Sequence, residues 1–239
     1  RGGAMDQAIA LGARAGSAAK LLFNPLRIQH VPVPEDWCFV VADTGVRAEK
    51  SGSAQRTYNQ RRSECEEALG QLVHHVVQRG LVRTTPAGYA DLLRQIEAER
   101  LLPLAQVVLP ASLFRRVRHV VTEAARVEEA CDRLRAADLA TFGTLMDASH
   151  GSLRGDFLVS SAELDDLAAI AREGGAAGAR LTGAGLGGCI VALADRATVD
   201  SVLETLVREY YEPRKLTERL DARLFVAAAS RGASCERVG

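Results

Sequence analysis

The chain has 239 residues, enough for one large domain or two small ones, each with its own core. Hydrophobic residues make up 47% of it and charged residues 25%, which excludes a disordered or fibrous protein. Lys+Arg and Asp+Glu both total 30, so the sequence lacks the basic excess that is typical of proteins on nucleic acid or acidic membranes.

The cysteine pattern and the apolar runs bear on the cellular compartment. Five cysteines are scattered without a C-x-x-C pair, which argues against a disulfide framework or a zinc site and favours a reducing compartment. No apolar run approaches the roughly 18 residues that a membrane helix needs. We therefore expect a soluble, cytoplasmic protein. The chain begins at Arg1 rather than at a methionine and shows no signal peptide, which is typical of a piece of a longer polypeptide.

The first part of the chain predicts a helix, three strands and a second helix. Helical spacing covers residues 5–13 and ends before Gly16. Three extended runs rich in β-branched and aromatic residues, with prolines beside them, follow at 18–23, 28–33 and 37–43. From about Tyr58 the apolar spacing becomes helical again, and Gly80 suits the left-handed end of that helix.

The remainder predicts more helices and a second group of strands. Residues 81–110 are less regular than the rest and contain three prolines. Helices are predicted at 114–134, at 139–146 and after a capping box of Ser160 and Glu163. A strand into Thr182, a glycine-rich loop, a strand at 189–194, a helix at 199–210 and a strand at 224–229 complete the pattern. We expect an α+β fold with helices on one face of a sheet.

The glycine-rich loop at 183–188 is the first candidate functional feature. It matches G-x-G-x-x-G, but a β-branched strand follows where a dinucleotide-binding fold needs a helix, which excludes the Rossmann interpretation. The P-loop pattern G-x-x-x-x-G-K-[ST] does not occur. Glycines let a phosphate or another backbone approach closely, and successive amides can bind an anion. The alternative is a tight hairpin that simply needs positive φ angles.

Asp6 is the second candidate, because it falls in the first helical turn after Gly2 and Gly3. Free amides and the helix dipole stabilise a carboxylate at that position. Two interpretations stay open at this point. Asp6 is either an ordinary first-turn aspartate, or a general base or charge stabiliser that faces a substrate hydroxyl.

Six blocks of the sequence, in order, resemble the galactokinases, a family of the GHMP small-molecule kinases. They are the G-x-M-D-Q segment at 2–7, the turn at 23–27, the Y-N-x-R-R-x-x-C block at 58–65, the R-H-V-x-x-E block at 118–123, the region around S-H-x-S-L-R at 145–165, and 179–189, which is similar to the third GHMP motif. The resemblance runs nearly end to end and corresponds to the C-terminal two-thirds of the family.

The resemblance implies a fold and a reaction. The fold would be the GHMP kinase fold, with residues 1–60 the remainder of the N-terminal domain. Residues 61–239 would form the ferredoxin-like C-terminal α/β domain with extra helices. The reaction would be ATP-dependent phosphorylation of the anomeric hydroxyl of galactose, with Mg²⁺ and with no nucleic acid or membrane partner.

The resemblance also implies roles for single residues. Asp6 would accept or polarise the proton of the C1 hydroxyl, Gly3 would lie at the edge of the sugar, and Tyr58 would contact the sugar. The loop residues that would support the phosphates of ATP are Gly183, Ala184, Gly185, Gly187 and Gly188. The family segments that supply further sugar contacts, the triphosphate loop and a magnesium contact are missing. We therefore expect no metal ligand in this chain and no activity from the chain alone.

Alternatives remain for the substrate, for the activity and for the role of Tyr58. Many galactokinases have Met, Gly and Phe where this chain has Leu181, Ala184 and Leu186. In these positions the chain more closely resembles the branch that contains the N-acetylgalactosamine kinases. Those kinases, however, tend to have Phe at the position of Tyr58. A non-catalytic regulator that binds galactose and ATP on the same scaffold is the second alternative. Tyr58 is otherwise a partly buried aromatic at a strand end.

The S-H-x-S-L-R region has no role assigned by its residue types. We predict that His150 is a hydrogen-bonded histidine between helices rather than a catalyst. Ser149 and Arg154 match the family without an assigned role.

Overall fold

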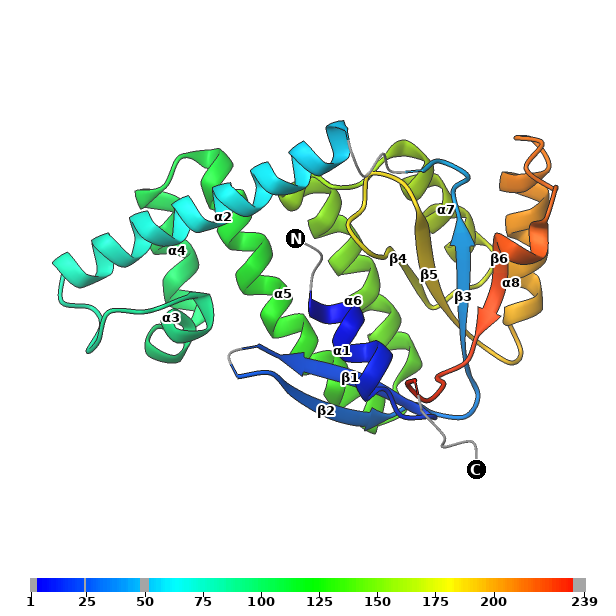
Figure 1. The fold of residues 1–239 in the computed structure, drawn as a ribbon, viewed down its shortest axis with the longest axis horizontal. Helices are drawn as coiled ribbons and strands as arrows, with labels where there is room; N and C mark the ends of the chain where they lie inside the picture. The colour runs from blue at the N-terminus through cyan, green and yellow to red at the C-terminus, as the bar shows by residue number, and fades with distance from the viewer. Residues whose placement is uncertain (1–3, 24, 48–51, 234–239) are drawn as a thin grey trace, which may run out of the picture.

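The structure is a computed structural model that describes residues 4–23, 25–47 and 52–233. Its centre is a four-stranded antiparallel sheet (Figure 1), in which the strand order is β4-β5-β3-β6. The strands are β3 (Trp37–Asp43), β4 (Gly178–Leu181), β5 (Cys189–Asp195) and β6 (Leu224–Ala227). In the register of the sheet, Val40 of β3 lies opposite Ala192 of β5 on one side and Val226 of β6 on the other.

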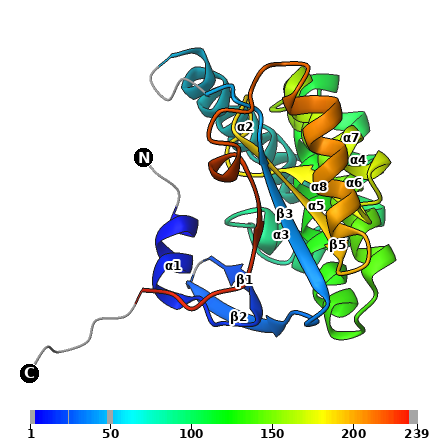
Figure 2. The same cartoon turned by 90° about the vertical axis from the view of Figure 1, so that its right-hand side faces the viewer.

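Two helices, α7 (Ala162–Glu173) and α8 (Val199–Leu206), cover one face of this sheet (Figure 2). Alternate residues of β5, among them Ile190 and Ala192, are fully buried against them, as the period of two in a strand requires. A π-helical turn, Val207–Tyr211, extends α8. The Tyr210 hydroxyl donates a hydrogen bond to the Thr44 carbonyl at 3.0 Å, which ties this turn to the end of β3.

The long helix α5 (Ala111–Arg135) and helix α6 (Leu139–Ser152) lie beside the β4 edge of the sheet. The side chain of Asp138 caps α6 by accepting a hydrogen bond from the Thr141 amide at 3.1 Å. A π-helical turn, Leu153–Phe157, continues α6, and Leu158 then adopts the left-handed conformation with φ 58°. This turn directs the chain toward the glycine-rich loop.

Helices α2 (Ser53–Gln78), α3 (Tyr89–Gln95) and α4 (Ala98–Val108) pack on α5 around a core of their own. Helices α3 and α4 both fall in the stretch 81–110, which the sequence marks only as less regular. Pro103 lies inside α4, and Leu101 and Ala105 on either side of it are fully buried. Because proline interrupts most helices, its presence concealed the apolar spacing of α4.

The N-terminal segment forms helix α1 (Ala4–Gly12) and a two-stranded antiparallel sheet of β1 (Ser17–Leu22) and β2 (Arg27–Pro32). Val31 of β2 is buried in a cluster with Trp37, Leu134 and Met146. The hairpin therefore packs against the ends of α5 and α6, which brings α1 toward the open face of the main sheet (Figure 1).

Most predicted elements are confirmed within a few residues, and the α+β class is confirmed. One cap differs, since Ser161 rather than Ser160 is the N-cap of α7 and accepts from the Leu164 amide. Ser160 instead donates to the Asp165 carboxylate. The division at residue 60 falls inside α2 and stays a prediction. Within the described residues, no helix combines the length and the apolar character that crossing a membrane requires.

Candidate active site

A cleft of about 520 Å³ lies between α1, α5, α6 and the face of the sheet that α7 and α8 do not cover. Its walls are mostly apolar and include Met5, Phe39 and Phe142. The polar and glycine positions that line it are Glu123, Arg126, Ser149, Arg180, Thr182 and Gly183. An apolar cleft with a few convergent polar groups is the usual form of a small-molecule site.

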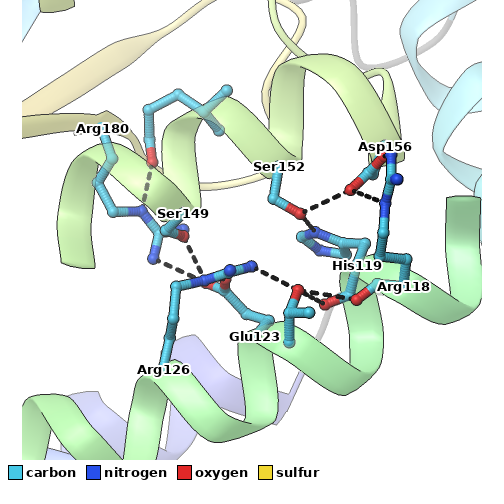
Figure 3. A network of polar contacts seen from close by, with 10 residues as sticks. Arg118, His119, Glu123, Arg126, Ser149, Ser152, Asp156 and Arg180 are labelled. Carbon is cyan, nitrogen blue, oxygen red and sulfur yellow. Dashed lines mark hydrogen bonds and ion pairs between the residues drawn. The ribbon is translucent and has the colours of Figure 1, made fainter. Parts of the chain in front are cut away.

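Glu123 is the centre of the polar cluster in this cleft (Figure 3). The Ser149 hydroxyl and the Nε of Arg126, at 2.7 Å, donate hydrogen bonds to its carboxylate, and Nη1 of Arg180 lies 3.4 Å away. Burial opposes the charge of Glu123, but these hydrogen bonds and guanidinium charges outweigh it and hold the pKa of the carboxyl below its ordinary value. Among the described residues that line the cleft, two guanidinium groups therefore face one carboxylate.

A second polar chain continues along α5 and the end of α6 (Figure 3). Nδ1 of His119 lies 2.9 Å from the Ser152 hydroxyl, which in turn faces the Asp156 carboxylate. Arg118 binds that carboxylate through two nitrogens, one of them Nε at 3.0 Å. Burial lowers the pKa of His119, which favours the neutral imidazole. These contacts join the R-H-V-x-x-E block on α5 to the S-H-x-S-L-R region at the end of α6.

The glycine-rich loop joins β4 to β5 at one end of the cleft. Its glycines at 183, 185, 187 and 188 all have positive φ, from 73° to 123°, so the predicted requirement for left-handed conformations is confirmed. A Cβ on Gly185 would lie 2.1 Å from the Val159 carbonyl oxygen, so no side chain fits there. The exposed residues Gly183 and Ala184 have amides with no hydrogen-bond acceptor among the described residues.

Of the predicted site residues that the structure describes, Gly183 lines the cleft, whereas Asp6 and Tyr58 do not. Asp6 is exposed in the first turn of α1, and its neighbour Met5 lines the same cleft as Gly183. Gly3 lies outside the described residues. Tyr58 is on α2 with 44% of its surface exposed and is not among the residues that line the cleft. The alternative for Tyr58, a partly buried aromatic at a strand end, is therefore wrong.

The polar cluster around Glu123 was not predicted from the sequence. Glu123 and Arg180 fall inside two of the family blocks, which was the available signal, but they are 57 residues apart and only the fold shows that they meet. Within 4–23, 25–47 and 52–233, no three His, Cys, Asp or Glu side chains come together in a way that could hold a metal ion.

Comparisons with known proteins identify the class to which this fold and cleft belong. Residues 127–212 match the family model described as the C terminal of GHMP kinases. The solved structure of L. major mevalonate kinase in complex with R-mevalonate has the same fold, with a TM-score of 0.52 at 20% identity over 91% of this chain and 50% of that one. The chain therefore has the fold of the GHMP kinases, and residues 127–212 resemble their C-terminal part.

Over nearly its whole length, the chain is similar to galactokinases. The galactokinase of Roseiflexus sp. (strain RS-1) is 38% identical over 96% of this chain and 54% of its own length. That of Fusobacterium nucleatum subsp. nucleatum is 35% identical over 97% of this chain and 55% of its own. Lactococcus lactis galactokinase complexed with galactose superposes with a TM-score of 0.75 at 30% identity, over 98% of this chain and 55% of that one. The predicted resemblance is confirmed, and the chain spans about half the length of the curated relatives it matches.

Proposed function

We propose that the full-length protein transfers the γ-phosphoryl group of ATP to the C1 hydroxyl of galactose, giving galactose 1-phosphate and ADP. A bond forms between O1 of the sugar and the γ-phosphorus, the bond from that phosphorus to the bridging oxygen of ADP breaks, and the hydroxyl proton is released. The observation that supports this most strongly is the similarity to galactokinases along nearly the whole chain. The structure supports the same proposal, because α1 and the glycine-rich loop line one cleft.

Asp6 is the proposed acceptor of the hydroxyl proton. Asp6 lies in the first turn of α1 and carries the carboxylate that a general base needs. It is exposed, so a substrate can reach it. Gly3 at the edge of the sugar and Tyr58 as a sugar contact complete the proposed substrate site.

The glycine-rich loop is the proposed support for the phosphates of ATP. The free amides of Gly183 and Ala184 and the excess positive charge of the cleft fit an anionic group. Gly185, Gly187 and Gly188 hold the loop in the conformation that exposes those amides. Phosphoryl transfer depends mainly on positioning and charge neutralisation, which is what this arrangement supplies.

Mg²⁺ is proposed only as a companion of the nucleotide. Magnesium in kinases is usually held by one or two carboxylates together with substrate phosphates, so it does not need a cluster of protein ligands. The part of the chain that the structure describes offers no such cluster. Magnesium neutralises charge on the phosphates when it is bound, and the residues described above orient the sugar and receive its proton.

The test follows ADP release by the full-length protein with ATP, Mg²⁺ and galactose. Asp6→Asn keeps the size of the side chain and removes the base, so we expect turnover to fall at least a hundredfold, the lower range for a lost general base. Asp200→Asn is a matched control, because Asp200 is also exposed in the first turn of a helix, α8, away from the cleft. Its turnover should equal that of the wild type.

Other outcomes would change the proposal. Turnover with N-acetylgalactosamine but not with galactose would keep the chemistry and replace the substrate. Galactose binding without turnover by the wild-type protein would contradict the enzyme and support a regulator on the same scaffold. Equal activity of wild type and Asp6→Asn would contradict the role of Asp6.

A further inference from the structure

Helix α6 forms a continuous seam along the outer edge of β4. At its start Gly143 approaches so closely that a Cβ on Gly178 would lie 2.0 Å from the Gly143 carbonyl oxygen. One turn later, Asp147 accepts a hydrogen bond from the Ala179 amide at 2.9 Å. Near the end of the helix, Nδ1 of His150 lies 3.2 Å from the Leu181 amide. Side chains of α6 thus occupy the place that a fifth strand would take.

Leu181 is the last residue of β4, two positions before Gly183. The Thr182 amide bonds to the Cys189 carbonyl of β5, so the amide of Leu181 points to the opposite side, where a strand edge is otherwise unpaired. The Leu181 carbonyl accepts a hydrogen bond from Nε of Arg180 at 3.1 Å. Arg180 is in turn paired with Glu123. Both backbone groups of Leu181 are therefore held by side chains that α5 and α6 position.

The hydrogen bond from Leu181 determines the tautomer of His150. A backbone amide can only donate, so Nδ1 must carry the lone pair and Nε2 the proton. Nε2 then faces Asp165 of α7, with its Oδ1 at 3.0 Å. Burial lowers the pKa of His150 and so favours this neutral form, although Asp165 opposes the effect, and Arg172 and Arg154 are the other charges that act on the ring.

We propose that His150 is a positioning residue, which holds Leu181 and thereby fixes the start of the glycine-rich loop in the conformation that receives the phosphates of ATP. This inference rests on the proposed function of that loop. The other side of the loop is already anchored, since the Leu186 amide donates to the Val159 carbonyl at 2.7 Å and the Gly188 amide to the Val46 carbonyl at 3.0 Å. Among the residues that the structure describes, β5 supplies the only backbone anchor of the exposed stretch of Thr182, Gly183 and Ala184.

His150 acts through Leu181 and not on the substrate. It is 4% exposed and does not line the cleft, so it cannot exchange a proton with a sugar or a nucleotide there. Removing its Nδ1 acceptor should therefore weaken nucleotide binding without changing the affinity for the sugar. If His150 only packed in the core, its substitution would change the affinities for nucleotide and sugar equally, or change neither.

The test compares His150→Asn with His150→Gln in the full-length protein. The amide oxygen of asparagine can occupy the place of Nδ1 and still accept from Leu181, whereas that of glutamine reaches the place of Nε2. Both substitutions remove the ring, so they share the loss of packing. Asp138→Ala adds a control that weakens α6 at its N-cap without contact with Leu181.

Three quantities are measured: hydrogen exchange of the Leu181 amide, the affinity for a non-hydrolysable ATP analogue, and the KM values for ATP and galactose. We expect His150→Gln to speed exchange at Leu181 and to weaken binding of the analogue roughly fivefold, the effect of one lost hydrogen bond, with the KM for galactose unchanged. His150→Asn should stay near the wild type. Asp138→Ala should lower stability without changing the affinity for the analogue.

The outcomes separate this inference from the proposed function. Equal behaviour of the Asn and Gln variants in exchange and analogue binding would overturn the role of His150, even if the wild type is an active kinase. A wild type without turnover would contradict the proposed activity, and binding of the ATP analogue would still decide the role of His150. No binding of the analogue by the wild type would overturn both.

Discussion

Gly143 on α6 and Gly178 on β4 touch through their backbones, and a Cβ on Gly178 would lie 2.0 Å from the Gly143 carbonyl oxygen. A Cβ on Gly143 would lie equally close to the carbonyl oxygen of Ala177. This contact brings the helix near enough to β4 for Asp147 and His150 to replace a neighbouring strand. The glycine-rich loop therefore depends on a helix–strand contact that lies well outside it.

Replacing Gly143 by alanine should destabilise the protein. The methyl group has no space, and overpacking of this kind costs about 1 to 3 kcal/mol even though alanine favours the helix. Gly151→Ala is the matched control on the same helix, because nothing lies within 4 Å of its Cβ position. That variant should gain about 0.5 to 1 kcal/mol from helix propensity. Urea unfolding of both variants measures the difference, and stabilisation by both would refute the close contact.

Local patterns in the sequence were sufficient for most of the fold. The apolar positions of α5, including Val117, Val121 and Leu134, are buried as their spacing predicts. The strands β1, β2 and β3 lie where β-branched residues and prolines placed them. The exceptions are α3 and α4, in a stretch that the sequence marks only as less regular. Pro103 lies inside α4, where it conceals the apolar spacing of that helix. Local spacing also could not distinguish Ser160 from Ser161 as the cap of α7.

The candidate site was predictable only in part. The glycine-rich loop and Asp6 carry local signals, namely glycines that need positive φ and an acidic residue in a first helical turn. The ion pair of Glu123 and Arg180 joins residues that are far apart in the sequence, and no local period encodes such a contact. The prediction that His150 is a hydrogen-bonded histidine between helices holds only in part, because Nδ1 accepts from the Leu181 amide of β4, while Nε2 lies 3.0 Å from Asp165 of α7. These neighbours of His150 can be identified only from the topology of the fold.

Gly185→Ala should destabilise the protein by more than the cost of placing alanine at a positive φ angle. A Cβ there would lie 2.1 Å from the Val159 carbonyl oxygen, and this carbonyl accepts the Leu186 amide. Gly80→Ala is the control, since Gly80 also has positive φ but open space around its Cβ position. The control should cost about 1 kcal/mol from the left-handed conformation, and Gly185→Ala about 1 to 3 kcal/mol more.

Hydrogen exchange of the Leu186 amide provides a local measurement beside thermal unfolding. We expect faster exchange in Gly185→Ala, because the methyl group displaces the Val159 carbonyl, and no change in Gly80→Ala. Equal losses of stability in the two variants, with Leu186 exchange unchanged in both, would show that the loop does not pack on Val159 as described.

The buried ion pair of Glu64 and Arg116 should contribute to stability in a pH-dependent way. Arg116 is 2% exposed, and its Nε donates to Glu64 at 2.6 Å. Glu64→Gln leaves this guanidinium without a charged partner, which should cost about 1 to 3 kcal/mol near neutral pH. Glu66→Gln on the same helix is the control. Its partner Arg62 is exposed, so we expect no measurable change.

The pH dependence follows from the depressed pKa of Glu64. Burial raises that pKa, but the hydrogen bonds and charges of Arg116 and Arg61 outweigh burial and lower it. A carboxyl whose pKa is lower in the folded state stabilises the fold above its unfolded pKa of about 4.3, and this stabilisation is lost as the pH falls through the folded value. The gap in unfolding free energy between wild type and Glu64→Gln should therefore be constant from roughly pH 6 to 7. It should narrow when the pH falls below the unfolded pKa of the carboxyl. Urea titrations of both proteins across this range measure the gap, and a gap independent of pH would mean that the charge of Glu64 does not stabilise Arg116.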